Sequence, residues 1–341
     1  MRRLIAPLLL AALLLAGCGA AKEQSSAELH SSDLFAMDTY MTLQVYGKEE
    51  LLRQGEELIL DLERRLSVTS ADSEIAAINR DEQGPVSEDT EVLLERALEL
   101  CERTGGALDL SVYPVVRAWG FTTGDYKVPE QAELDALLER VDYTKIQLED
   151  GFVTLADGME IDLGSVTKGY ASSQVISLWR EKGVTSALLN LGGNVHALGA
   201  KPDGSPWRVA IQDPFGDSYL GVLEIEDKAV ITSGGYERFF EQDGETYWHI
   251  IDPATGRPAR SGLTSVTVIG EDGLVCDALS TALFVMGLGK AAQLWVQSGD
   301  FEAVFVTSDG AIYITQGLED SFSPVENYAN MEVMVISRGQ N

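Results

Sequence analysis

The apolar residues of this chain change their spacing often and in no regular order, and this irregular alternation is what most limits the possible folds. Residues 49–66 repeat apolar side chains at helical spacing, whereas residues 35–46 alternate as a strand does. Short apolar runs separated by Gly, Asp and Pro fill most of 187–232. A doubly wound parallel sheet needs an even succession of strand and helix. The pattern instead predicts a single multilayer α+β domain of mixed or antiparallel sheets with packed helices.

Local signals place further elements. Ser87 is a typical cap for a second helix that stops at Gly105-Gly106, and Pro129 stands where a helix can begin. Asp150-Gly151 and Asp243-Gly244 are strong hairpin turns. The other expected elements are a helix from Ser165 to about Gly183, a strand over 265–269, a helix over about 272–286, and a helix and a strand within 290–315 that close the body.

The amino terminus predicts export and a lipid anchor. Arg2 and Arg3 precede an apolar run over 4–16, which is the pattern of a secretory signal. The quartet Leu15-Ala16-Gly17-Cys18 resembles a lipobox, in which Cys18 would be acylated; the alternative is an ordinary signal that happens to contain a cysteine. We expect a signal peptide at 1–17, a lipidated flexible tether at 18–33 and a folded domain at 34–341. The protein would then be held at the cell membrane, facing the extracytoplasmic side.

Composition excludes some classes of function. The formal net charge is −29, and loss of Arg2 and Arg3 with the signal would make it −31. So acidic a chain is unsuited to binding nucleic acid or an anionic lipid surface. Cys101 and Cys276 fall in apolar helical patterns, which favours buried thiols over a disulfide. Three histidines with no Cys/His cluster argue against structural zinc.

Two segments could handle a nucleotide and a metal. Asp277 and Thr281, four residues apart, share one face of a helix and could offer oxygen ligands to Mg²⁺. Spacing alone favours the other explanation, a carboxylate paired with a basic residue and a threonine facing the core. In residues 161–169 a strand end runs through Gly164-Ser165 into a helix with Lys168 in its first turn, a place suited to a phosphate. The glycine spacing is not that of a Walker A loop.

Two further segments are ambiguous on their own. His249, one of two histidines in the expected folded domain, ends a strand just before the turn-forming run 252–258. It could be a general base or a structural polar contact. Gly105-Gly106, followed by Ala107-Leu108-Asp109, could let a ligand approach the backbone or could simply end a helix.

Taken together and in order, these segments resemble the ApbE family, the FAD:protein FMN transferases, over about residues 35–315. The family-like phrases are Ala36-Met37-Asp38-Thr39, Asp72-Ser73-Glu74-Ile75, Gly106-Ala107-Leu108-Asp109, Tyr113-Pro114 with Trp119-Gly120-Phe121, Asp162-Leu163-Gly164 through Lys168-Gly169-Tyr170, Leu191-Gly192-Gly193-Asn194, Ser233-Gly234 with Tyr236 and Arg238, His249-Ile250-Ile251-Asp252-Pro253, and Asp277-Ala278-Leu279-Ser280-Thr281-Ala282. The resemblance implies an ApbE-like, T-fold-related architecture and a flavin transferase catalytic domain over 34–341.

The resemblance also implies a reaction. FAD is the substrate, with Mg²⁺ on its pyrophosphate; a Ser or Thr hydroxyl of an acceptor protein attacks the FMN phosphorus, and AMP leaves. Asp277, Thr281 and the backbone carbonyl of Thr167 match the metal ligands. Acceptors in this family present a Ser/Thr-Gly-Ala-Ser/Thr type of segment, often in membrane redox complexes.

Other residues receive roles from the same resemblance. Lys168 would neutralise the pyrophosphate, Asp162 would accept a hydrogen bond from FAD, and His249 would take the proton of the incoming hydroxyl. With Asp277, Lys168 and His249 form the expected catalytic set. The positions that match the lining of the flavin nucleotide site are Met37, Thr69, Ala107, Leu108, Asp109, Asp162, Lys168 and Ile251.

One position departs from the family pattern. After Leu66-Ser67 this chain has Val68-Thr69, where many members carry a tyrosine that could stack on a ring of FAD. Either another aromatic, such as Tyr113 or Trp119, replaces it, or FAD is held more loosely, at a cost of about 0.5–1.5 kcal/mol.

Two alternatives remain open at the level of sequence. If water is the nucleophile, the same site makes a Mg²⁺-dependent FAD pyrophosphatase that gives FMN and AMP. A flavin-binding lipoprotein without chemistry is the other alternative, although a mere binder has no need of Asp277 and Thr281 at the scissile phosphate.

Overall fold

The protein is described by a computed structural model over residues 28–328 and 331–339. The predicted signal peptide, the lipobox with Cys18 and most of the predicted tether lie outside the described residues. The described part is an α+β fold built on one large mixed sheet, which confirms the predicted fold class.

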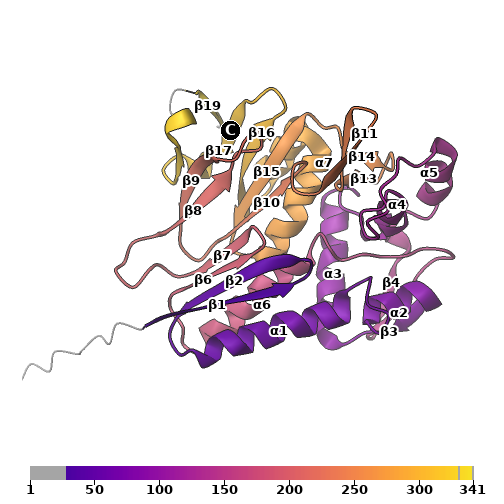
Figure 1. The fold of residues 1–341 in the computed structure, drawn as a ribbon, viewed down its shortest axis with the longest axis horizontal. Helices are drawn as coiled ribbons and strands as arrows, with labels where there is room; N and C mark the ends of the chain where they lie inside the picture. Colours follow the sequence, from indigo (N-terminus) through magenta and orange to yellow (C-terminus); the bar gives the residue numbers. More distant parts are fainter. Residues whose placement is uncertain (1–27, 329–330, 340–341) are drawn as a thin grey trace, which may run out of the picture.

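The central sheet has nine strands, and all neighbouring pairs are antiparallel except the last, β17 with β19. The strands follow one another across the sheet in chain order, with other elements inserted between them, so β1 and β19 lie at opposite edges of one layer (Figure 1). In sheet order the strands are β1 (Leu29–Ala36), β2 (Thr39–Tyr46), β6 (Ala187–Leu191), β7 (Asn194–Leu198), β10 (Ala229–Gly234), β15 (Leu263–Gly270), β16 (Phe301–Thr307), β17 (Ile312–Thr315) and β19 (Val333–Ile336).

Helices cover one face of this sheet. In α1 the residues Leu51, Ile59, Leu62 and Leu66 recur at helical spacing and are buried against the strands. Arg64 and Arg65 lie in its last turn, where positive charge suits the helix dipole. Figure 1 shows the helices lying along the sheet. They are α1 (Glu50–Leu66), α6 (Thr167–Glu181) and α7 (Gly273–Gln297), and α3 (Glu88–Arg103) packs against α7.

The opposite face is covered by a second, three-stranded sheet. Its strands are β8 (Trp207–Gln212), β9 (Tyr219–Ile225) and β18 (Phe322–Pro324). Trp207, Leu223 and Phe322 pack against the residues of β10, β15 and β16 that point away from the helices. The alternation of inward side chains along each strand therefore divides the interior into a helix side and a sheet side.

Smaller elements pack beside the main layers. Near α1 and α3 lie α2 (Glu74–Asp81) and the short sheet of β3 (Gln83–Pro85), β5 (Phe152–Thr154) and β4 (Gln147–Glu149). A separate apolar cluster around Trp119, Phe121 and Leu134 joins α4 and α5 to a hairpin. Its elements are α4 (Tyr113–Ala118), α5 (Gln131–Leu138), β11 (Phe239–Gln242), β12 (Glu245–Trp248), β13 (Ile251–Asp252) and β14 (Arg257–Pro258).

Most predicted elements are present. Helix α1, both hairpins, and the helices that begin after Ser165 and Asp272 lie where expected, and Cys101 and Cys276 are free and buried. Among the described residues one helix, α7, is long and apolar enough to cross a membrane, but most of that apolar window is buried inside the protein. Asp277 also lies within it, so we interpret α7 as a core helix.

Several boundaries were wrong. The tether predicted to extend to residue 33 is too long, because residues 29–33 belong to β1, where backbone pairing with β2 orders a polar stretch that lacks apolar periodicity. Likewise, the expected strand over 35–46 is a hairpin whose turn is Met37-Asp38, both at positive φ. Helix α7 continues past Met286 across a break at Gly287 (φ 75°). The folded domain also does not end at Thr315, because strands β18 and β19 follow it.

Candidate active site

The site forms where helices α6 and α7 cross. Gly169 of α6 and Gly273 of α7 meet so closely that a Cβ on either residue would clash with the backbone carbonyl of the other. Only glycine permits this approach. The contact brings Asp277, one turn further along α7, against the first turn of α6.

Asp277 is held from two directions. Its Oδ2 accepts a hydrogen bond from the backbone N–H of Gly169 at 2.7 Å, and its Oδ1 accepts one from Nδ2 of Asn194 at 3.0 Å. The residue is 6% exposed. Burial raises the pKa of the carboxyl, while the charge of Lys168 and these two hydrogen bonds oppose that rise. The alternative was that Asp277 pairs with a basic residue. The described residues show no salt bridge to Asp277, and Lys168 acts on it only by its nearby charge.

The other two predicted metal ligands lie on the same two helices. Thr281 is one turn beyond Asp277, and its hydroxyl lies 3.3 Å from Oγ of Ser233 on β10. Thr167 begins α6, and its hydroxyl donates to the carbonyl of Leu163 at 2.7 Å, so its side chain is already committed. A carboxylate, a hydroxyl and a main-chain carbonyl are hard oxygen donors of the kind that Mg²⁺ takes. In the described ranges no three His, Cys, Asp or Glu side chains group together as a metal site, so any metal there relies on these mixed donors.

Charged groups from three segments meet at this crossing. Burial raises the pKa of Glu237 to about 7; Lys168 opposes the shift and Asp277 adds to it. The residue nevertheless keeps access to solvent. Burial also raises the pKa of Asp162, and Arg238 opposes that shift. The loop after β10 therefore adds an acid and a guanidinium to the predicted residues.

His249 lies at the end of β12, close to Lys168 and Arg238. Its backbone N–H donates to the carbonyl of Arg238 at 3.1 Å, and its Nδ1 lies 3.2 Å from the same oxygen. The ring of Phe121 meets the imidazole edge to face, with 6.3 Å between centroids. Burial, with the charges of Arg238 and Lys168, lowers the pKa of His249 to about 4, so the imidazole is neutral at pH 7.

The segment after Gly105-Gly106 is tied to the strand end at Asp162. The backbone N–H of Asp162 donates to the carbonyl of Leu110 at 2.9 Å. Asp109 caps the following turn: its Oδ1 accepts from the backbone and the hydroxyl of Ser111, at 2.8 and 2.6 Å. Its Oδ2 accepts from the backbone of Tyr143 at 3.2 Å. The carboxylate of Asp109 therefore shapes the loop.

The remaining predicted lining residues differ in what they can offer. The side chains of Leu108 and Ile251 are buried in two apolar clusters, so their main chains are the parts left to meet a nucleotide. Ala107 and Met37 are half-buried at the edge of the main core. The backbone N–H of Met37 is held by Oε1 of Glu63 at 2.6 Å, which fixes the turn of the first hairpin.

Thr69 is exposed, and its hydroxyl contacts Oγ of Ser67 at 3.0 Å. Beside it lies a hollow of about 290 Å³, lined by Val68, Tyr113, Arg117 and neighbouring residues of α2. The suggestion that Trp119 replaces the missing tyrosine was wrong, because Trp119 is fully buried and donates from Nε1 to the carbonyl of Gly256. Tyr113 lines the hollow and remains a candidate.

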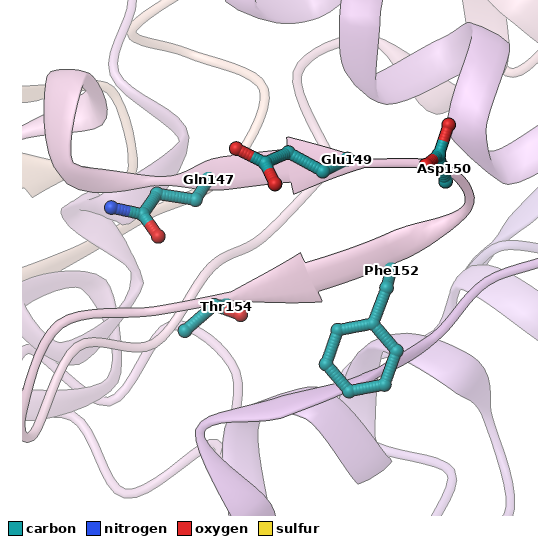
Figure 2. A pocket seen from close by; sticks show the side chains of 5 residues that line it. All are labelled: Gln147, Glu149, Asp150, Phe152 and Thr154. Carbon is teal, nitrogen blue, oxygen red and sulfur yellow. The ribbon is translucent and has the colours of Figure 1, made fainter.

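A second hollow, of about 210 Å³, lies on the hairpin of β4 and β5. Figure 2 shows the side chains that line it, Gln147, Glu149, Asp150, Phe152 and Thr154, spread along the two strands. These side chains do not converge on a common point, and the predicted site residues are not among them. We assign no function to it.

Reasoning from sequence missed four members of the site. Asn194, Ser233 and Arg238 stand within the family-like phrases, but the phrases alone gave them no role. Glu237 had no signal beyond its position between Tyr236 and Arg238. The place of each in the site can be recognised only from the fold, which brings β7, β10 and the loop after β10 to the crossing of α6 and α7.

Fold and site together define an α+β protein that gathers a lysine, carboxylates and a neutral imidazole beside a helix N-terminus, a set of groups suited to phosphate chemistry. Comparison with known proteins agrees. The sequence profile of the ApbE family matches residues 37–305. The chain belongs to the ApbE family.

Individual relatives cover nearly the whole chain. A FAD:protein FMN transferase of Treponema pallidum is 34% identical over 334 residues, which is 90% of this chain and 92% of that protein. One from Klebsiella pneumoniae is 33% identical, covering 89% of this chain and 97% of the relative. The crystal structure of the ApbE protein from Thermotoga maritima matches with a TM-score of 0.81 at 32% identity, covering 85% of this chain and 98% of the other. The apo form of the Pseudomonas stutzeri flavinyl transferase ApbE gives 0.79 at 29% identity, covering 88% and 98%.

Proposed function

We propose that this protein transfers FMN from FAD to a Ser or Thr hydroxyl of an acceptor protein and releases AMP. The observation that carries the proposal is the meeting of Asp277, Lys168 and His249 at the first turn of α6, in a chain similar over most of its length to FAD:protein FMN transferases. These groups match the three needs of phosphoryl transfer: a place for a cation, a charge for the phosphates and a proton acceptor.

The nucleotide would be held by fixed positive charge. Lys168 is in the first turn of α6, where its own charge and the helix dipole favour an anion. Arg238 lies close enough to Asp162 and His249 to influence the pKa of both. A pyrophosphate placed along this edge would meet Lys168 on one side. The main chains of Ala107, Leu108 and Ile251, with Met37, would frame the rest of FAD.

Asp277, Thr281 and the carbonyl of Thr167 would hold Mg²⁺, which supplies positive charge to the pyrophosphate as negative charge develops there. The chain contributes the geometry. The crossing of α6 and α7 brings into contact the two helices that carry these groups. Burial restricts the motion of the Asp277 side chain. The pairing of Asp277 with Gly169 leaves the second lone pair of that oxygen available.

His249 would take the proton of the incoming hydroxyl. A pKa of about 4 makes it neutral, and so able to accept, but also a weak base. Part of that depression comes from Arg238 and Lys168. The negative charge of a bound nucleotide would offset both, and would therefore raise the pKa of His249 toward the range in which a base works well near pH 7.

The test is a measurement of AMP from FAD and Mg²⁺, with and without an acceptor. Acceptor-dependent AMP supports the transferase. AMP released at the same rate without acceptor would make the protein a FAD pyrophosphatase, with water in place of the hydroxyl. FAD binding with no AMP under either condition would make it a binding protein.

The place of action is also a proposal. An acylated Cys18 would hold the protein at the outer side of the cell membrane, near membrane redox proteins that carry a Ser/Thr-Gly-Ala-Ser/Thr type of segment. Cys18→Ser should then abolish labelling by a clickable fatty acid and release the protein from membranes or leave it unprocessed. Equal labelling of the variant and the wild type would contradict the anchor.

A further inference from the structure

Strand β7 sends two polar side chains into the crossing of α6 and α7. Asn194 and His196, two residues apart, share one face of the strand, and each is 3% exposed. Asn194 donates from Nδ2 to Oδ1 of Asp277 on α7 at 3.0 Å. His196 lies with Nδ1 3.0 Å from Oγ of Ser172 on α6. A strand thus holds both helices at the point where they meet.

The contact between Asn194 and Asp277 has a specific geometric effect. With Gly169 alone as donor, one carboxylate oxygen would be fixed and the group could still turn about its Cβ–Cγ bond. A second donor on the other oxygen fixes the carboxylate plane. Each oxygen keeps a lone pair that is not used by these donors.

Burying the amide of Asn194 is unfavourable unless it is hydrogen-bonded, which indicates that this residue has a specific role. Most side chains packed around β7 are apolar. Asn194 also stands 83 residues from its partner in sequence, so the pair depends on the whole fold. In metal sites, partners of this kind orient the ligand, and their loss weakens metal binding about 10–100-fold.

We infer that Asn194 is a positioning residue: it orients the carboxylate of Asp277 and thereby sets the affinity of this site for a divalent cation. The inference rests on the proposed function, because it takes Asp277 to be a metal ligand. Asn194 itself does not touch the reacting atoms in this account.

The test uses two variants and a matched control. Asn194→Ala removes the donor, and Asn194→Leu removes it while keeping most of the volume, so that a packing loss in one is checked by the other. Asn190→Ala is the control. Asn190 is on the same hairpin and exposed, and its Oδ1 accepts from the backbone of Gly193 at 2.8 Å, away from Asp277. Thermal unfolding of all three confirms that they are folded.

Two readouts are needed. Mn²⁺ binding in the presence of FAD, followed by electron paramagnetic resonance, gives the dissociation constant directly. The Mg²⁺ dependence of AMP release gives the concentration for half-maximal rate and the rate at saturation. We expect both Asn194 variants to raise the Mn²⁺ Kd and the half-maximal Mg²⁺ concentration by about 10–100-fold. The saturated rate should recover to within a few fold of wild type, and Asn190→Ala should match wild type in both readouts.

The failures of the two claims are distinguishable. If folded Asn194→Ala and Asn194→Leu bind Mn²⁺ as tightly as wild type, the positioning role is wrong while the proposed function stands. If the wild type with FAD binds no Mn²⁺ and its AMP release is independent of Mg²⁺, the metal assignment fails and this inference falls with it. A saturated rate that stays low in the variants with unchanged Kd would likewise overturn it.

Discussion

The two ends of the site are built in opposite ways. At one end, the α6–α7 crossing holds Asp277 through buried hydrogen bonds to Gly169 and Asn194 and through a glycine contact that allows no side chain. At the other end, His249 sits after a two-stranded hairpin and is held by one carbonyl, that of Arg238, and by an aromatic neighbour. The first end is fixed by the main core, and the second belongs to a small cluster at its edge.

Aromatic packing around the β11–β12 hairpin holds His249 in place. Phe240 on β11 stacks on Tyr126 at 5.2 Å and on Tyr247 at 5.3 Å, and it meets Phe121 at 5.7 Å between centroids. Phe121 in turn contacts His249. Such packing allows small displacements that a buried carboxylate with two donors does not. Under the proposed function, the rigid end would hold the nucleotide and cation, and the adaptable end would face the acceptor protein.

Of the substitutions considered, His249→Asn, at the adaptable end of the site, should lower the rate of transfer most. Since Asn cannot act as the base, the rate of transfer should fall about 10²–10⁴-fold. FAD affinity should remain near that of wild type, because the groups that grip the nucleotide are intact. The measurement is single-turnover transfer at saturating FAD beside a FAD binding titration. A variant that binds FAD weakly but reacts at full speed when saturated would show that His249 is structural.

Asp277→Ala should have a somewhat smaller effect at the rigid end. Removing the carboxylate takes away the negative charge that would hold the cation, and we expect the rate to fall about 10²–10³-fold at low Mg²⁺. Thr281→Val keeps the shape of the side chain and should do less damage. Turnover measured across a Mg²⁺ series decides the point. Near-normal turnover of Asp277→Ala at low Mg²⁺ would remove it from the ligand set.

At the rigid end, buried His196 should make the free energy of unfolding depend on pH. Burial lowers the pKa of His196 to about 4. In the unfolded chain the imidazole takes up a proton below about pH 6.5, whereas in the folded protein it does so only near pH 4. Stability contributed by neutral His196 is therefore present above pH 6.5 and lost as the pH falls from 6.5 to 4, by about 2–3 kcal/mol in all.

His196→Gln should flatten that part of the curve. Chemical denaturation at several pH values between 4 and 7 compares the slopes of the variant and the wild type. His249→Asn serves as the comparison at the adaptable end, where the pKa of the imidazole is likewise lowered to about 4. Parallel curves for wild type and His196→Gln would show that His196 does not titrate in this way.

Thr69→Tyr should have the smallest effect and the opposite sign. An aromatic side chain beside the hollow lined by Val68 and Tyr113 could stack on a ring of FAD, which corresponds to a gain in affinity of about 2–10-fold. The FAD dissociation constant is the measurement, with Thr69→Leu as a control for added apolar surface. A Thr69→Tyr variant no tighter than Thr69→Leu would argue that FAD does not reach this hollow.

The sequence predicted what depends on neighbours along the chain. The helical spacing in α1, the Asp-Gly turns of the two hairpins, and Asp277 and Thr281 on one helix face all follow from local periodicity. The roles of Lys168 and His249 required the family resemblance, since the signal around Lys168 is weak on its own and a lone histidine such as His249 is more often structural.

The rest depends on contacts between distant segments. The boundary of β1 was missed because strand pairing, rather than apolar spacing, orders residues 29–33. The bond from Asn194 to Asp277 and the contact between Gly169 and Gly273 join residues that are far apart in sequence. No local pattern distinguishes these residues from others of the same type. Glu237 is the clearest case, because desolvation and the charge of Asp277 raise its pKa against the opposing charge of Lys168, and all three groups are brought together only by the fold.

The central claim is that FMN leaves FAD for a protein hydroxyl at this site. Co-expression with an acceptor that carries a Ser/Thr-Gly-Ala-Ser/Thr type of segment tests it most directly, with in-gel flavin fluorescence and mass spectrometry of the attachment residue. The account predicts covalent FMN on the Ser or Thr of that segment, matched by equal AMP when the purified proteins are mixed with FAD and Mg²⁺, and lost with His249→Asn or Asp277→Ala. AMP formed without covalent flavin on the acceptor would contradict it.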